Sequence, residues 1–108
     1  MGKRDDSKGG SDRKMKIRYD ETGGFEVWAE RDLIYTSRGV IPLFLKGEIG
    51  FSIVEGPETK MLVEAFLQAY EIDVEDRVRT WRTIPTNIEY SMSKDKKAVM
   101  HFRLTIVG

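Results

Sequence analysis

Residues 14–30 contain two segments of alternating apolar and polar side chains, one on each side of a short break. The apolar sets are Met15, Ile17 and Tyr19 before the break, and Phe25, Val27 and Ala29 after it. A period of two on both sides is typical of a β-hairpin. The break at residues 21–23 predicts a three-residue loop with Gly23 in the left-handed conformation.

The register of this hairpin follows from the loop. It places Arg18 opposite Glu26, Lys16 opposite Trp28, and Lys14 opposite Glu30. Opposite charges across a ladder stabilise it by a few tenths to about 1 kcal/mol each. We therefore expect Glu26 and Glu30 to serve as structural partners of basic residues rather than as a catalytic pair.

Composition limits the classes of protein to which this chain can belong. A length of 108 residues with 40% hydrophobic content suits one globular domain, expected over residues 13–108. Residues 1–12 contain no apolar side chain after Met1, which predicts a disordered N-terminal arm. There is no cysteine, no long apolar run and no signal-like leader, so we expect a cytoplasmic protein that does not enter membranes.

Charge is unevenly distributed although the net charge is zero. Residues 1–16 carry six basic and three acidic side chains, a net of +3. The remaining residues carry 12 basic and 15 acidic side chains, a net of −3. The chain therefore combines a basic arm with a mildly acidic body, and lacks the overall basic charge that is usual for nucleic-acid binders.

Three further strands are expected before residue 55. Residues 33–36 and 40–45 are apolar and β-branched runs around a turn at residues 37–39. Pro42 cannot donate a hydrogen bond to a ladder, so its strand should be an edge strand or carry a bulge. Residues 49–54 alternate again, with Ile49, Phe51 and Ile53 on one face.

The sequence predicts one long helix over residues 57–72. Pro57 and Glu58 are helix-start signals, and Lys60, Glu64, Gln68 and Glu71 form a narrow polar stripe on an otherwise apolar segment. We therefore expect a largely covered helix with Phe66 buried. Residues 73–84 are ambiguous: their caps and charges favour a short second helix, whereas their threonines favour a strand.

The C-terminal part predicts a second hairpin. Residues 87–92 and 98–107 both alternate, and the second segment is expected to lie inside a sheet because both of its faces carry apolar residues. The predicted fold class is therefore α+β, with an antiparallel meander or small barrel-like sheet packed on one long helix. A barrel of the oligonucleotide-binding (OB) type is the alternative topology.

The sequence contains no recognisable catalytic, cofactor or metal signature. His101 is the only histidine, so a histidine cluster for zinc is excluded within one chain. We interpret it as a strand residue that pairs with Glu89 or its neighbours, in preference to an acid–base dyad. The glycines match no phosphate loop or dinucleotide fingerprint.

Two clusters of basic and aromatic residues are the candidate contact sites. The first consists of Lys14, Lys16, Arg18 and Trp28, and the second of Arg77, Arg79, Trp81 and Arg82. They favour a non-enzymatic protein-interaction or accessory domain, with a protein partner or self-association. The alternative is single-stranded nucleic-acid binding through the arm and these clusters. An enzyme or sensor for a small molecule is the third class.

Overall fold

Strands dominate the computed structural model, which describes residues 13–108; the predicted disorder of residues 1–12 lies outside that range. The elements are β1 (Arg13–Tyr19), β2 (Gly24–Ala29), β3 (Asp32–Arg38), β4 (Leu43–Leu45), β5 (Glu48–Val54), α1 (Thr59–Gln68), β6 (Ala69–Glu75), β7 (Thr80–Met92) and β8 (Ala98–Ile106). Eight strands and one helix over the described residues confirm the α+β class. Seven strands were expected, five before residue 55 and two in the C-terminal hairpin, and the additional strand is β6.

All eight strands belong to one sheet with the order β3-β2-β1-β6-β7-β8-β5-β4. The β1–β6 pair is parallel and every other pair is antiparallel. Because β3 and β4 are the two ends of this order, the sheet is open and is not a barrel. The edge position predicted from Pro42 is confirmed for β4, and the interior position predicted for the last strand is confirmed for β8.

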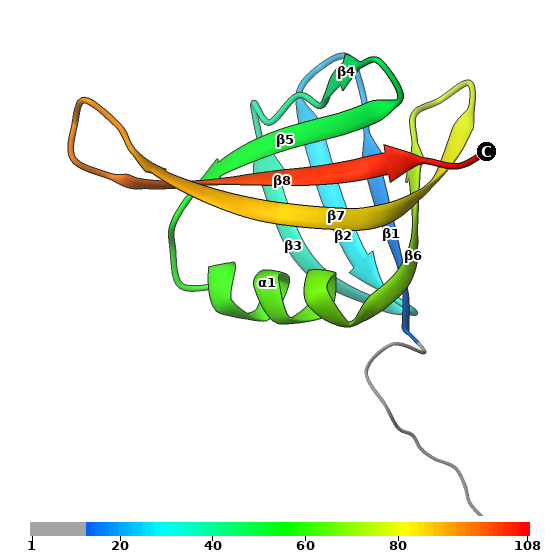
Figure 1. Ribbon diagram of the computed structural model, residues 1–108, viewed down its shortest axis with the longest axis horizontal. Coiled ribbons are helices and arrows are strands. Elements are labelled where there is room, and N and C mark those ends of the chain that lie inside the picture. The colour runs from blue at the N-terminus through cyan, green and yellow to red at the C-terminus, as the bar shows by residue number, and fades with distance from the viewer. Residues whose placement is uncertain (1–12) are drawn as a thin grey trace, which may run out of the picture.

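The open sheet folds onto itself and encloses the core. The rings of Phe25 on β2 and Phe51 on β5 have centroids 5.0 Å apart, which brings the first and last parts of the sheet face to face. Phe66 on α1 meets Phe102 on β8 at 5.1 Å. Figure 1 shows α1 along one end of the folded sheet and β4 at the opposite end.

The first hairpin has the predicted register. Arg18 lies opposite Glu26 and Lys16 lies opposite Trp28. The loop is the predicted one, because Asp20 and Gly24 close it and Gly23 has a φ of +94°. The alternation also holds in burial, since Met15 and Ile17 face the core. Local pattern and turn chemistry therefore determine this part of the fold.

The predicted helix over residues 57–72 is too long. The observed helix α1 ends at Gln68, and residues 69–75 form β6. The physical reason is a change of period, because Ile72 and Val74 alternate with acidic residues and pack beside Met15 and Ile17 of β1. Of the two alternatives left open for residues 73–84, the short second helix is wrong and the strand is observed: β6, a turn and the start of β7 occupy that segment.

Burial on α1 is narrower than predicted. Phe66 is buried as expected, together with Leu62 and Ala65. Met61 and Leu67, in contrast, are exposed despite being apolar. The helix covers one end of the sheet and contacts it along a single face, so the apolar character of its other side is not explained by the core.

Candidate functional site

The basic residues of the first predicted cluster lie on the outer face of β1, beside the acidic strand β6. Lys14 Nζ lies 3.3 Å from Glu71 Oε2 and 3.2 Å from Asp73 Oδ2. Arg18 Nε lies 3.2 Å from Glu75 Oε1. The hydrogen bond to Asp73, followed by that to Glu71, raises the pKa of Lys14. Two of the three basic residues on β1, Lys14 and Arg18, are therefore neutralised within the chain.

These ion pairs correct the partners that we expected. The predicted partners were Glu26 on β2 and Glu30 just after it, whereas the observed ones belong to the parallel neighbour β6. Sequence reasoning missed them because it assigned that segment to a helix. Glu26 instead accepts a hydrogen bond from Trp28 Nε1 at 3.1 Å. Trp28 is thus fixed against its own strand, opposite Lys16.

The second predicted cluster divides into three separate places. Arg79 alone lies over the Trp81 ring, with its guanidinium carbon 5.5 Å from the ring centroid. Arg82 Nη2 donates to Glu71 Oε1 at 3.2 Å on the outer face. Arg77 lines a small polar hollow of about 270 Å³ beside Tyr19, where burial, followed by the nearby Asp76 carboxylate, raises the tyrosine pKa.

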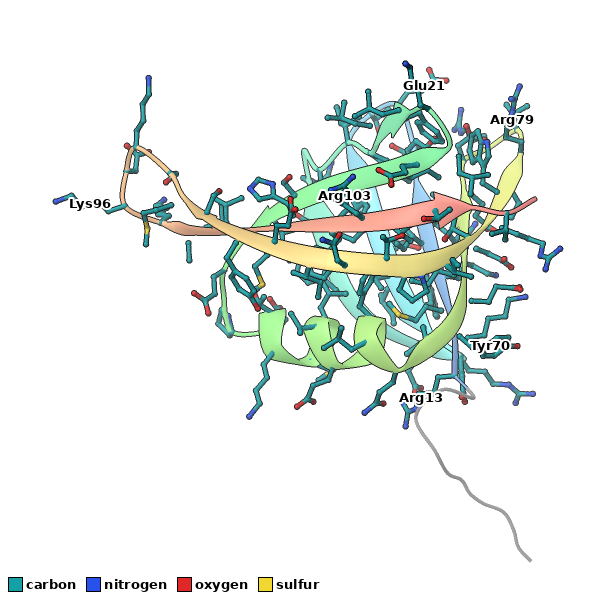
Figure 2. All side chains as sticks on the ribbon, viewed as in Figure 1. Arg13, Glu21, Tyr70, Arg79, Lys96 and Arg103 are labelled. Atoms are coloured by element: carbon teal, nitrogen blue, oxygen red, sulfur yellow. The ribbon has the colours of Figure 1, made fainter. Side chains whose placement is uncertain are left out.

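Trp81 has an aromatic neighbour that the sequence did not suggest. The rings of Phe44 on β4 and Trp81 on β7 have centroids 4.6 Å apart and are tilted by 50°. Figure 2 shows Arg79 on the β6–β7 turn, at the end of the molecule that also carries the β4–β5 turn. Arg79, Trp81 and Phe44 therefore form one aromatic–basic group at the edge of the sheet.

Strand β4 is an apolar edge that the described residues leave uncovered. It pairs with β5 on one side and with no strand of residues 13–108 on the other. Leu43, Phe44 and Leu45 are 64%, 41% and 69% exposed, and the preceding Ile41 is 64% exposed. Edge strands of soluble proteins usually carry charges or prolines that block pairing with other chains. Within β4 itself such a charge is missing.

A hollow of about 500 Å³ lies beside this edge, on the outer face of β4, β5 and β8. Leu43 and Leu45 line one side of it, and Glu48 and Arg103 line another. Arg103 Nη2 lies 2.8 Å from Glu48 Oε1, and Arg103 Nη1 lies 3.6 Å from Glu89 Oε2. The hydrogen bond to Glu48 raises the arginine pKa further above its usual value. The hollow thus has an apolar side and a charged side.

His101 has the role on a polar strand face that we expected. It lies opposite Glu89, and its two ring nitrogens have the hydroxyls of Ser52 and Ser91 as partners, at 2.7 and 2.8 Å. A neutral imidazole can donate to one serine and accept from the other. No carboxylate hydrogen-bonds this ring in residues 13–108. The arrangement therefore satisfies the histidine without forming a catalytic triad.

The β4 edge is the site that the sequence prediction overlooked. Its signal was present, because residues 40–45 are apolar and the proline among them predicted an edge position. An exposed apolar edge is prone to pair with another chain, and Pro42 blocks such pairing only at the position before β4. The neighbouring Glu48 and Arg103 could not be found in this way, since their contact joins residues 55 positions apart.

The described residues contain neither a metal-ligand cluster nor a membrane-spanning helix. Across residues 13–108, no three His, Asp or Glu side chains are grouped so that they could hold a metal ion. The helix α1 is neither long nor apolar enough to cross a membrane.

Comparison with known proteins adds no family to this picture. No protein-family model, curated protein or solved structure shows a significant match to the chain. The geometry of the β4 edge and its surroundings is therefore the basis for a functional proposal.

Proposed function

We propose that this protein is a non-enzymatic interaction domain that binds an extended segment of a partner protein along β4. The observation that carries the proposal is the free apolar edge, with Leu43, Phe44 and Leu45 all exposed at the end of the sheet. A peptide that adds to such an edge gains main-chain hydrogen bonds from the strand and specificity from the pockets beside it.

Both faces of β4 offer contacts to an added strand. On the inner side, the Phe44 ring packs against Trp81 at a tilt of 50°, and Arg79 lies over the same indole. Tryptophan and arginine are the residue types most enriched among interface positions that dominate binding energy. On the outer side, Leu43 and Leu45 border the hollow. Alternate side chains of a partner strand would therefore meet an aromatic group on one face and an apolar wall on the other.

The length of β4 sets the strength of this interaction. Three residues form few main-chain hydrogen bonds, so side-chain burial must contribute much of the affinity. Full burial of a leucine contributes about 1.5–3 kcal/mol. Because Leu43 and Leu45 are each about two-thirds exposed, covering one of them contributes roughly 1–2 kcal/mol.

Nucleic-acid binding has less support from the geometry. Lys14, Arg18 and Arg82 of the predicted contact set are occupied by carboxylates of β6. A phosphate backbone would have to displace those carboxylates and overcome their repulsion. An effect of salt on binding would separate the two proposals, since phosphate contacts make affinity fall steeply with salt.

A random-peptide selection against the folded protein tests the proposal. We expect the selected peptides to have alternating apolar residues. Their affinity for the Leu43→Lys variant should be lower by about tenfold or more, which corresponds to a loss of roughly 1.4 kcal/mol of binding free energy. The matched control is Leu33→Lys on β3, the other free edge, which should leave affinity unchanged. Failure to select any peptide, or peptides equally sensitive to both variants, would refute strand addition at β4.

A further inference from the structure

The free edge of β4 presents the main-chain groups of Phe44. On the other side of β5, the Ile106 N–H donates to the Gly47 carbonyl at 2.8 Å. Because main-chain groups alternate in direction along an antiparallel strand, Ile49 also bonds to β8 and not to β4. Phe44 lies opposite Ile49, so it has no main-chain bond to β5. Its N–H and its C=O therefore both point toward the free edge.

The side chains of β4 are symmetric about the same residue. The strand reads Leu43-Phe44-Leu45, so reversing its direction leaves the order of its side chains unchanged. Both leucines line the outer face, whereas Phe44 packs on the inner face against Trp81. Pro42, two positions before Phe44, has no N–H with which to extend a ladder. The free hydrogen-bonding groups and the side-chain pattern thus have one common centre at Phe44.

We propose that the partner at this edge is a second copy of this chain, whose β4 pairs antiparallel with β4 about a two-fold axis between the two Phe44 residues. This inference rests on the proposed function, since it requires strand addition at β4 and names the added strand. In such an interface each copy contributes the same surface. At its centre, one residue and its copy form a hydrogen-bonded pair that exchanges both N–H···O bonds. Phe44 offers both groups that this pair requires.

The apolar side chains of the two copies meet in this register. Leu43 lies opposite Leu45 of the other copy in a non-hydrogen-bonded pair, in which the Cα atoms are only about 4.5 Å apart and the side chains come close together. The two-fold axis makes this leucine contact occur twice. On the inner face, the Phe44 ring lies beside its copy and enlarges the aromatic group that it forms with Trp81.

Charge favours a copy of the strand over a charged partner. β4 carries no charged side chain, and the nearest one in sequence after it is Lys46. In the proposed register Lys46 lies opposite Pro42 of the other copy, about 13 Å along the strands from its own copy. That separation exceeds the Debye length of about 8 Å at physiological salt. A charged partner strand would find no group of opposite sign on β4, whereas an identical strand matches it at every position.

The short edge makes this dimer weak. Stable interfaces bury about 1,200–2,000 Å² in total, and transient ones bury less. Each copy contributes the three residues of β4 and the exposed Ile41 before them. We therefore expect a reversible monomer–dimer equilibrium that is detected at about 0.1–1 mM protein.

Two charge variants test the register. Leu43→Lys places a lysine opposite Leu45 of the other copy, and the symmetry makes the change count twice. A loss of about tenfold for each contact makes the dimer about a hundredfold weaker if the two losses add. Combining Leu43→Lys with Leu45→Glu in one chain brings opposite charges face to face in the antiparallel register, which stabilises a ladder. In a parallel pairing the new lysine would instead face its own copy.

Sedimentation equilibrium from about 10 μM to about 1 mM protein measures the association. We expect a dimer in the original protein and no detectable dimer in the Leu43→Lys variant. The double variant should associate about tenfold more tightly than Leu43→Lys alone. Leu33→Lys, at an exposed position of the other edge strand, is the matched control and should dimerise like the original protein. Thermal unfolding checks that all variants fold.

Each other outcome overturns a defined statement. A protein that stays monomeric over this range, while selected peptides bind and depend on Leu43, would overturn the self-pairing and leave the proposed function intact. A dimer that Leu43→Lys does not weaken would do the same, because another surface would form it. A dimer that Leu43→Lys breaks and the double variant does not restore would overturn the antiparallel register. A monomer that binds no selected peptide would overturn both the self-pairing and the proposed function.

Discussion

Replacing Phe66 with alanine should destabilise the protein more than any change on the exposed side of α1. Phe66 is 1% exposed and meets the Phe102 ring at 5.1 Å in an edge-to-face arrangement. Truncation of a buried phenylalanine to alanine costs about 3–5 kcal/mol, because apolar surface is lost and a cavity remains. For a domain of this size each 1 kcal/mol shifts the unfolding midpoint by about 4–8 °C.

Urea unfolding, monitored by tryptophan fluorescence, measures the free energy of unfolding of each variant. Because small domains are stabilised by only about 5–15 kcal/mol, Phe66→Leu provides a milder variant in case the alanine form does not fold. Leu67→Ala is the matched control, since this neighbour on the same helix is 67% exposed and its loss should cost less than about 0.5 kcal/mol. Equal losses at the two positions would show that the wrong face of α1 has been assigned to the core.

Three further predictions concern the first hairpin and its charged face. Gly23→Ala should cost about 1–2 kcal/mol in urea unfolding because of its positive φ, whereas Gly56→Ala, with open space around it, should be nearly neutral. Hydrogen bonds from Arg82, followed by Lys14, lower the pKa of Glu71, so its contribution to stability is present at neutral pH and is lost as pH falls below the usual glutamate range. Glu71→Gln should therefore lower the free energy of unfolding at pH 7 and make it fall less steeply as the pH decreases. The same dependence on acid pH as in the original protein would show that the ion pairs of Glu71 do not contribute to stability. Trp28→Ala should cost about 1 kcal/mol and leave peptide binding at β4 intact, and global unfolding of this variant would mean that the outer face is also core.

The sequence correctly predicted those parts of the fold that are determined by residues close together in the chain. The first hairpin followed from alternation and a glycine loop, and the edge position of β4 followed from the missing donor of Pro42. The prediction for residues 69–84 was wrong because the structure of this segment depends on residues far away in the sequence. Tyr70 and the charged residues around it suit either a helix end or a strand, and only the parallel pairing with β1, more than 50 residues away, selects the strand.

The same distinction between local and distant causes applies to the prediction of the candidate site. Basic and aromatic residue types indicated an interaction surface, but their partners are set by tertiary pairing. Lys14 meets β6 carboxylates, and Trp81 meets Phe44 of β4 rather than a ring of arginines. The hollow depends on Gly50 lying between Leu43 and Arg103, three residues from three strands. A single sequence does not indicate which residues become neighbours on strands that no short loop connects, such as β5 and β8.

Amide hydrogen exchange of the protein with and without a selected peptide tests the central claim most directly. Strand addition at β4 places new main-chain hydrogen bonds on that edge, so exchange of amides in residues 43–45 should slow about tenfold or more at saturating peptide, as the fraction of unbound protein falls. Amides of β3, the other edge, should be unchanged. Protection on β1 and β6 with no change at β4 would contradict the account and return attention to the charged face.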